Sequence, residues 1–251
     1  MIDRRAFLLS TAAATVAERL GLLRGSRLAQ TRLASTPMAT PESVKQALSR
    51  EKLAPPAHGK VKVACVLSSS VTLIDWVGPE AVFGAWLYDE STKKERAFFE
   101  VFTVGESREI RDPGFNVIPD YTYDNAPQAQ IIVVPAQAGS PKFYQWLKKA
   151  SESADLTMSV CIGARHLARL GLLDGQVATT HHDYIKPYTK EFPKVRWVSG
   201  RRFVEGPKFA TSAGVTAGID LALRVVERYF GREKAVAVTK VMEYESTGWM
   251  V

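Results

Sequence analysis

The most regular feature of the chain is a series of short apolar runs that do not alternate with polar residues. Val61–Leu67 is rich in β-branched side chains, and every residue of Ile131–Val134 is aliphatic. Such runs are typical of strands buried on both faces, as in a parallel sheet covered by helices. The same reasoning predicts strands at residues 98–104, 156–160 and 177–180, two short strands within 195–206, and another near 209–211.

Helix signals lie between these runs. Gly78-Pro79 places a proline where the first turn of a helix tolerates it, which predicts a helix over residues 80–88. Strands that alternate with helices predict a single α/β domain over residues 60–251, with a mostly parallel sheet covered on both faces. The other predicted helices are 141–153, 164–170, 183–191, 214–229 and 233–243, and residues 106–129 are expected to form a short hairpin.

Composition narrows the class of protein. The chain has 251 residues, of which 46% are hydrophobic and 24% charged, as in ordinary globular proteins. Two cysteines exclude a disulfide-dense domain and a four-cysteine metal site. The sequence has no stretch of 18 uncharged apolar residues, so we expect no membrane span.

The net charge of +7 is unevenly distributed. Residues 1–36 hold six arginines, no lysine and two acidic residues, so they supply more than half of the excess. The nearly balanced remainder argues against a nucleic-acid partner. A basic cluster near aromatic residues is expected to be a solvated hairpin rather than a nucleic-acid surface; it comprises Arg196, Arg201 and Arg202, with Trp197 and Phe203.

The N-terminus has the order of an export signal. Arg4-Arg5 precedes Phe7-Leu8 and an apolar run that extends to residue 17. This order is typical of a bacterial twin-arginine signal, so we predict export of the chain to the periplasm, with residues 1–36 as the signal and 37–59 as a linker. The alternative is an amphipathic leader of another kind or an N-terminal helix, in which case the protein is cytoplasmic.

One strand–turn–helix segment carries the strongest chemical signal. Cys161 lies between a predicted strand and helix, with Gly163 and Ala164 behind it. Small neighbours let a backbone bend sharply, as in a nucleophile elbow, and a helix N-terminus favours a thiolate. The alternative is that Cys161 is a small core residue. Cys65, in the middle of the first strand, is expected to be core.

Several segments resemble one family in order along the chain. They resemble the ThiJ/PfpI family of the class I glutamine amidotransferase-like superfamily, and most closely its isonitrile hydratases and the ligand-binding-like half of certain AraC-type regulators. The resemblance runs from about residue 61 to residue 231 and implies a flavodoxin-like three-layer sandwich. The matching segments are residues 73–80, 132–135, 159–164, 170–175, 178–181 and 211–220.

The resemblance also implies site residues. Cys161 would be the elbow nucleophile, and Asp75, expected on the loop after the first strand, would reach its thiol. Without the resemblance, the alternative interpretation is that Asp75 is a carboxylate that caps a helix. An oxyanion or substrate would be bound by the backbone N–H of Ile162, together with the loop around Gln137 and with Gly163.

Two positions depart from the family pattern. Peptidase and glyoxalase-like members commonly have histidine directly after the nucleophile, where this chain has Ile162. The Pro-Gly-Gly expected after the fourth strand is Pro135-Ala136-Gln137. The first departure argues against proteolysis, and the second leaves the substrate open.

The histidine pair allows two interpretations. His181 matches the family's Thr-Thr-His and either lies near Cys161 or is a structural histidine at the sheet edge. We expect no metal at His181 and His182, because neighbouring residues on a strand point apart. No organic cofactor is expected.

The leading hypothesis is a cysteine-dependent hydratase of the isonitrile hydratase type, which acts on a small electrophilic substrate. The second is a non-enzymatic small-molecule-binding or stress-related protein, and a glycation-repair or peptidase activity ranks third. The regulator branch is disfavoured, because only about twenty residues follow Gly231. The family also allows a homodimer.

Overall fold

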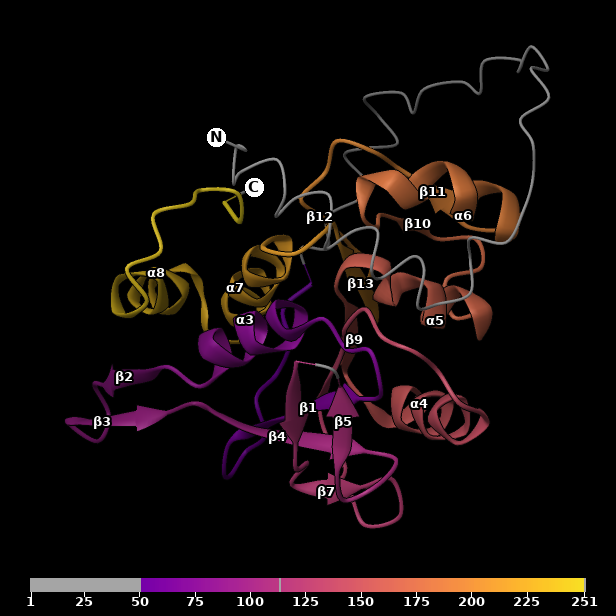
Figure 1. Ribbon diagram of the computed structural model, residues 1–251. Coiled ribbons are helices and arrows are strands. Elements are labelled where there is room, and N and C mark those ends of the chain that lie inside the picture. Colours follow the sequence, from indigo (N-terminus) through magenta and orange to yellow (C-terminus); the bar gives the residue numbers. More distant parts are fainter. Residues whose placement is uncertain (1–50, 113, 251) are drawn as a thin grey trace, which may run out of the picture. The chain divides into compact units, whose positions relative to one another are not determined.

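The computed structural model describes residues 51–112 and 114–250, with no account of the side chain of Asp112. A seven-stranded sheet forms the middle layer, in the order β12-β13-β9-β8-β1-β4-β7 (Figure 1). All its strands run parallel except β12, which pairs antiparallel with β13 at one edge. The strands are β1 (Val61–Leu67), β4 (Phe99–Gly105), β7 (Tyr121–Thr122), β8 (Ile131–Val134), β9 (Leu156–Ser159), β12 (Phe203–Glu205) and β13 (Phe209–Ser212).

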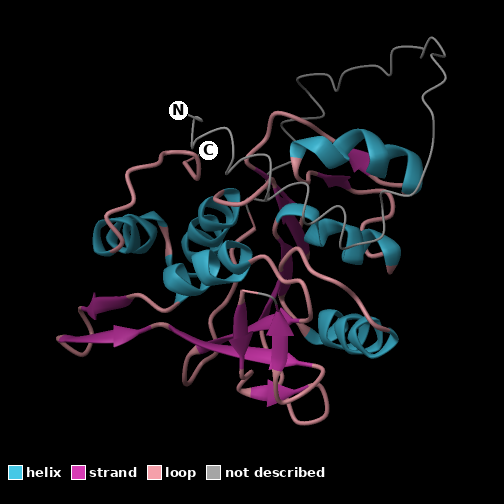
Figure 2. Cartoon of the chain, viewed as in Figure 1, coloured by secondary structure: helices cyan, strands magenta, loops and turns pink. Residues whose placement is uncertain are grey.

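Helices cover both faces of this sheet, as Figure 2 shows for the described residues. Helices α4 and α5 lie on one side, whereas α3, α7 and α8 lie on the other (Figure 1). This arrangement confirms the predicted flavodoxin-like sandwich. The helices are α3 (Leu73–Phe83), α4 (Pro141–Ser153), α5 (Ala164–Arg169), α6 (Ile185–Glu191), α7 (Ala217–Phe230) and α8 (Arg232–Val241), with short 3-10 helices η1 (Cys161–Gly163) and η2 (His182–Tyr184).

The core follows from the apolar runs seen in the sequence. Every residue of β8 is buried, as predicted for a central strand. On one face, Ile132 and Val134 pack with Phe143 of α4 and Leu167 of α5. Burial of such side chains stabilises each by about 1.5–3 kcal/mol relative to exposure, so the sheet is a firm base for the loops at its carboxyl edge.

Within the described residues, three smaller pairs of strands lie outside the main sheet. Residues 106–129 contain the predicted hairpin, formed by β5 (Ile110–Asp112) and β6 (Phe115–Val117), while β7 joins the main sheet. Strands β10 (Val177–Ala178) and β11 (Arg196–Trp197) pair in parallel. The strand predicted over residues 177–180 therefore ends early, because the N–H of Thr179 donates to the side chain of Thr211 instead of continuing a ladder.

The helix predicted over residues 80–88 is wrong in its bounds. Helix α3 begins at Leu73 and holds Pro79 inside it. Residues 86–89 form strand β2 (Trp86–Asp89), which pairs antiparallel with β3 (Lys94–Ala97). A proline inside a helix removes one hydrogen bond and crowds the carbonyl four residues earlier, and α3 tolerates it at Pro79. As a result, Asp75 lies in the first turn of α3 and not on a loop.

The start of α7 also differs from the prediction. The sequence favours a helix from residue 214, but Val215 has φ of 56° and α7 begins at Ala217. A β-branched residue with positive φ is rare, and this conformation cannot continue into a right-handed helix. The turn at Val215 belongs to the site described below.

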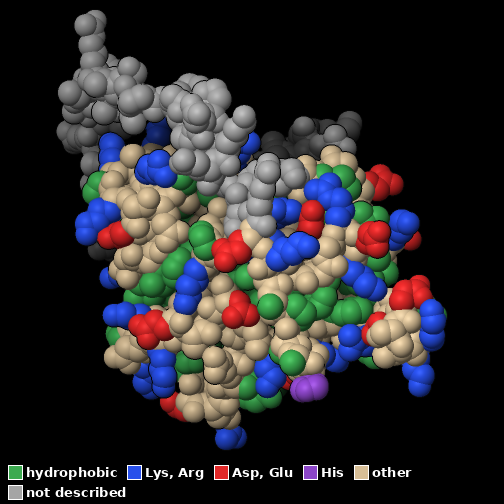
Figure 3. Space-filling view, turned by 180° about the vertical axis from the view of Figure 1, so that it is seen from behind, with side chains coloured by type: hydrophobic (Ala, Val, Ile, Leu, Met, Phe, Trp, Pro, Cys, Tyr) green, Lys and Arg blue, Asp and Glu red, His purple; other side chains and the backbone are tan. Residues whose placement is uncertain are grey.

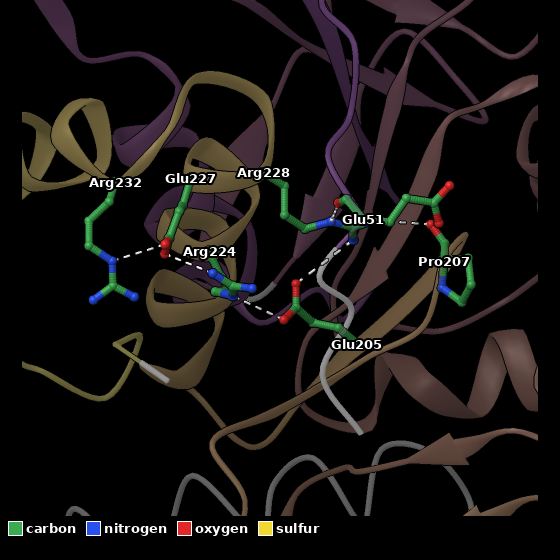
Figure 4. Close-up of polar contacts among 7 residues, drawn as sticks. All are labelled: Glu51, Glu205, Pro207, Arg224, Glu227, Arg228 and Arg232. Atoms are coloured by element: carbon green, nitrogen blue, oxygen red, sulfur yellow. Dashed lines mark hydrogen bonds and ion pairs between the residues drawn. The ribbon is translucent and has the colours of Figure 1, made fainter. Parts of the chain in front are cut away.

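Buried arginines of α7 join this helix to β12 by ion pairs and to the segment that precedes β1 by a hydrogen bond. Arg224 contacts Glu205 of β12 at 3.0 Å and Glu227 at 2.8 Å (Figure 4). The Nε atom of Arg228 donates to the carbonyl of Glu51 at 3.0 Å. Loss of one partner from such a buried network costs several kcal/mol, because it leaves an uncompensated charge. The network therefore fixes residue 51 of the predicted linker against the domain.

The remaining sequence expectations meet the structure only in part. The predicted export signal and residues 37–50 of the predicted linker lie outside the described residues.

Among the helices of the described part, none is both long enough and apolar enough to cross a bilayer. Figure 3 shows acidic and basic side chains interspersed over the face seen from behind. In the basic cluster, Arg202 forms an ion pair with buried Asp220.

Candidate active site

The nucleophile elbow lies at the carboxyl edge of the sheet. Strand β9 ends at Ser159, and Cys161 follows with φ of 58°, which is the left-handed region. Its N–H donates to the carbonyl of Ala213 at 3.1 Å, and its own carbonyl accepts from Thr180 Oγ1 at 2.8 Å. Non-glycine residues with positive φ cost of order 1–3 kcal/mol and persist only where neighbours hold them. The bent backbone predicted at Cys161 is therefore present and doubly anchored.

Gly163 is what lets the elbow approach the neighbouring strand. A β-carbon at this position would lie 2.2 Å from the carbonyl oxygen of Val134 and 2.8 Å from that of Pro135. Both obstacles are backbone atoms, so they cannot rotate away. The glycine thus brings η1 against the end of β8, and this close packing is the role the geometry gives it.

Two backbone donors point at the thiol. The N–H groups of Ile162 and Val215 interact with Cys161 and favour its thiolate. Burial and the nearby Asp75 charge have the larger effect, however, and together they raise the pKa of the thiol well above its ordinary value. The residue is 8% exposed. The expectation that the helix N-terminus keeps this thiol ionised is thus outweighed by desolvation.

Asp75 faces this thiol from α3. The N–H of Ala136 donates to its Oδ2 at 3.2 Å, and the N–H of Thr72 donates to the carbonyl of Ala136 at 2.8 Å, so the start of α3 is tied to the loop after β8. Burial raises the pKa of Asp75 to about 7, although Ala136 and Cys161 both favour the carboxylate. Oδ1 is buried and has no hydrogen-bond partner of ordinary geometry among the described residues. The interaction with Cys161 is one of those that favour the Asp75 carboxylate.

The two side chains form a coupled acid pair. A buried carboxyl with a pKa near neutrality can both give and take a proton at physiological pH. The thiol cannot ionise readily beside a carboxylate, because the two negative charges would share one buried site. A proton that moves from sulfur to Asp75, or onward to a substrate, removes this conflict. The arrangement can therefore support nucleophilic attack by sulfur coupled to proton transfer.

The loop after β8 is held in place by buried polar contacts, and the predicted substrate-binding role of its backbone N–H groups stays a prediction. The Gln137 side chain is 2% exposed and donates to the carbonyl of Val66 at 3.0 Å. Its backbone carbonyl contacts His166 Nε2 at 3.1 Å, and His166 Nδ1 contacts the Tyr144 hydroxyl at 3.0 Å. Burial lowers the pKa of His166 to about 4, so this histidine is neutral and structural. The Gln137 side chain therefore braces the loop.

His181 lies beside the elbow but does not join the acid pair. A β-carbon at Gly214 would lie 2.4 Å from His181 Cδ2, so the imidazole packs directly on the backbone that precedes Val215. Its Nδ1 accepts from the N–H of Asp183 at 3.4 Å, and burial lowers the pKa of its side chain. Among the described residues, no hydrogen bond connects His181 with Asp75 or Cys161.

Sequence reasoning missed three neighbours of the thiol. Thr180 holds the Cys161 carbonyl, Val215 directs an N–H at the sulfur, and Tyr184 lies close enough that the Cys161 charge contributes to the raised pKa of its phenol, after burial. The Thr-Thr-His segment contained Thr180 and could have drawn attention to it. Nothing in the sequence indicates the positive φ of Val215.

Cys65 has the setting expected of a core residue. It is fully buried within β1, and burial raises the pKa of its thiol far above the ordinary value. The protein thus has one cysteine at a strained turn with an acidic partner and another sealed inside the sheet. Only the first has the surroundings of a nucleophile.

Comparison with known proteins identifies the domain. The DJ-1/PfpI family profile matches residues 61–228. The transcriptional regulator GbdR of Pseudomonas aeruginosa is 31% identical over 137 residues, which are 53% of this chain and 37% of GbdR. Isonitrile hydratase of Pseudomonas putida is 32% identical over 139 residues, which are 52% of this chain and 59% of that enzyme. The chain thus spans less than two thirds of the length of these curated relatives.

A solved structure agrees with the family assignment. A ThiJ/PfpI family protein from Pseudomonas syringae superimposes with a TM-score of 0.64 over 84% of this chain and 83% of the other, at 22% identity. At this level of identity the likeness concerns the fold alone. The sequence profile and the fold lead to the same conclusion: the chain belongs to the DJ-1/PfpI family, also called ThiJ/PfpI.

Proposed function

We propose that this protein is a cysteine-dependent hydratase that converts an isonitrile into an N-substituted formamide. The observation that carries the proposal is the Asp75–Cys161 pair: a nucleophile on a strained turn faces a buried carboxyl whose pKa is raised to about 7. Similarity to isonitrile hydratase of Pseudomonas putida supports the choice of substrate class. The 8% exposure of Cys161 favours a small substrate with a slender reacting end.

The reaction balances with the one proton that the pair shares. Sulfur attacks the terminal isonitrile carbon, and that carbon takes the shared proton, which gives a thioimidate on Cys161. The Asp75 carboxylate then removes a proton from water as the oxygen adds to the carbon, and Asp75 returns this proton to nitrogen. Collapse of the tetrahedral adduct breaks the carbon–sulfur bond, releases the formamide and leaves the hydroxyl proton with the pair.

Backbone groups have supporting parts in this scheme. The N–H groups of Ile162 and Val215 interact with the sulfur, so they stabilise the negative charge that develops there when Cys161 leaves. The N–H of Ala136 holds Asp75 in place throughout. No step requires an oxidant or reductant, because water is the only co-substrate.

A second candidate function is binding of a small molecule without turnover. It is favoured by the similarity to regulators such as GbdR and by the raised pKa of the Cys161 thiol, which leaves little thiolate at rest. In this case the Asp75–Cys161 pair would be a polar contact for a ligand. Stabilisation by small electrophiles or metabolites, together with absent turnover, distinguishes this function from the first.

The experiment that separates the two functions is a turnover assay on the purified protein. A simple alkyl isonitrile is supplied, and formamide is measured by chromatography. We expect turnover by the wild type, background rates for Cys161→Ala, and a loss of roughly 10²- to 10⁴-fold for Asp75→Asn, the range typical of a general acid–base group. Cys65→Ala is the matched cysteine control. Turnover that survives in Cys161→Ala rules out the nucleophile assignment.

A further inference from the structure

His181, His182 and Asp183 form a compact cluster, called here the His-His-Asp cluster, that the proposed reaction does not use. The two imidazole rings stack with centroids 4.3 Å apart and an interplanar angle of 29°. The expectation that these neighbours point apart is therefore wrong. It assumed the alternation of a strand, whereas His181 is the N-cap of η2 and the chain turns there.

Ligand atoms of the three side chains converge. His181 Nδ1 lies 3.6 Å from Asp183 Oδ2, and His182 Nε2 lies 3.3 Å from Asp183 Oδ1. One donor atom from each residue falls within 4.8 Å of the other two. Ligands about 2.1 Å from a tetrahedral ion lie about 3.4 Å from each other. The two histidine–carboxylate spacings are close to this value but involve different oxygens of Asp183, so a small side-chain adjustment would bring one atom of each residue onto a single ion.

We propose that the His-His-Asp cluster binds one divalent transition-metal ion of the zinc class. Two imidazoles and a carboxylate are a donor set that suits zinc and cobalt better than magnesium or calcium, which prefer oxygen ligands. Three protein ligands leave a fourth position for water or an exchangeable ligand.

The surroundings of the cluster fit this role. His181 is held rigidly, because it packs on the backbone of Gly214 and lies 6.2 Å, centroid to centroid, from the Tyr184 ring. His182 and Asp183 have side-chain exposures of 82% and 58%, so an ion can reach them from solvent.

The competing explanation is a histidine–aspartate ion pair with no metal. In that arrangement His181 Nδ1 accepts the Asp183 N–H at 3.4 Å, a long and weak hydrogen bond that an ion at Nδ1 would replace. An ion pair in which two of the partners are mostly exposed adds little stability of its own. The two explanations differ in whether cobalt acquires a tetrahedral spectrum on the protein.

The position of the cluster gives it access to the thiol site. It begins one residue after Thr180, which holds the Cys161 carbonyl, and His181 packs on Gly214, the neighbour of Val215. A metal here would lie at the rim of the candidate active site. The inference does not depend on isonitrile turnover, because metal binding is measured separately.

The test is a titration of the full chain, purified without a histidine tag, with Co²⁺ followed by displacement with Zn²⁺. We expect one ion per chain and the visible absorption bands of tetrahedral cobalt, with competition by zinc measured by calorimetry. His182→Ala and Asp183→Asn should each weaken binding by roughly tenfold or more. His181→Ala is less suited as the sole variant, because it also removes the cap of η2.

Two controls isolate the cluster from other donors. His58→Ala removes an exposed histidine outside the cluster, and Cys161→Ala removes the nearby thiol; neither should change the stoichiometry or the spectrum. The proposal is overturned if cobalt gives no tetrahedral bands, or if the double variant His182→Ala, Asp183→Asn binds as tightly as the wild type. A loss of binding in Cys161→Ala would place the ion on the sulfur and would equally overturn it.

Discussion

The carboxyl of Asp75, in the first turn of α3, faces the thiol of Cys161 at the end of β9, and each group changes the protonation of the other. The two residues are 86 positions apart in the sequence and meet because their strands β1 and β9 flank β8 in the parallel sheet. Ligands bind beyond the carboxyl ends of strands in such sheets.

Removal of the Asp75 charge should stabilise the protein above neutral pH. Its pKa is raised from 3.8 in the unfolded chain to about 7 in the folded one, so the folded state holds the proton more tightly. The stability linked to this proton is complete below pH 3.8 and is lost as pH rises through about 7. Asp75→Asn should therefore be more stable than the wild type at pH 8, by up to about 4 kcal/mol.

Urea denaturation at about pH 5 and pH 8 measures this effect. The difference between variant and wild type should be larger at the higher pH. Asp124→Asn changes an exposed carboxyl and is the matched control. An Asp75→Asn variant whose relative stability is the same at both pH values would show that Asp75 is ionised throughout.

The same substitution should make Cys161 more reactive. At about pH 8 the Asp75 carboxylate raises the pKa of the thiol, so the wild type should react with iodoacetamide more slowly than an ordinary exposed thiol. Asp75→Asn removes this charge and should accelerate alkylation by roughly tenfold, the equivalent of one pKa unit. Mass spectrometry of the Cys161 peptide gives the rate. An unchanged or slower rate in the variant would mean that the carboxylate does not restrain the thiol.

Gly163→Ala should damage the fold. The new β-carbon would lie 2.2 Å from the Val134 carbonyl oxygen, and the elbow could avoid it only by moving away from β8. We expect a loss of about 3 kcal/mol or more. Gly114→Ala, where the β-carbon would meet nothing within 4 Å, should have a small effect in the same denaturation experiment. Equal stability of the two variants would contradict the close packing of the elbow.

The export signal remains a prediction from the sequence. Arg4 and Arg5 lie outside the described residues, and their order ahead of Phe7-Leu8 is the basis of the proposal that the protein is exported by the twin-arginine route. The double substitution Arg4→Lys, Arg5→Lys should retain the protein in the cytoplasm of a bacterium that has this translocase. Fractionation of cells followed by immunoblotting measures the distribution. A periplasmic fraction unchanged by the substitution would exclude the route.

The central strands and the elbow could be predicted because local sequence determines them. Ile131–Val134 is apolar throughout. Cys161 follows a strand, and the small residues Gly163 and Ala164 come directly after it. Asp75 was identified through the family resemblance, which the DJ-1/PfpI profile confirms, although its helix was placed too late. Thr72 is a residue type that commonly begins helices, but the prediction followed the Gly78-Pro79 signal instead; in the structure Thr72 is the N-cap of α3 without a side-chain hydrogen bond.

The rest of the site depends on tertiary contacts that no local pattern encodes. Residues 86–89, predicted as the end of a helix, form a strand instead because β2 pairs with β3. The N–H of Val215 reaches the sulfur only because Val215 adopts a positive φ, and the histidine pair stacks only because η2 begins at that point. In each case the decisive backbone geometry comes from neighbours distant in sequence or from the turn itself.

The most direct measurement is the intact mass of the protein quenched during turnover of an alkyl isonitrile. The account predicts a transient species heavier by the mass of one isonitrile, located on the Cys161 peptide and decaying as formamide appears. Formamide produced without this adduct, or an adduct of the same yield in Cys161→Ala, would contradict it.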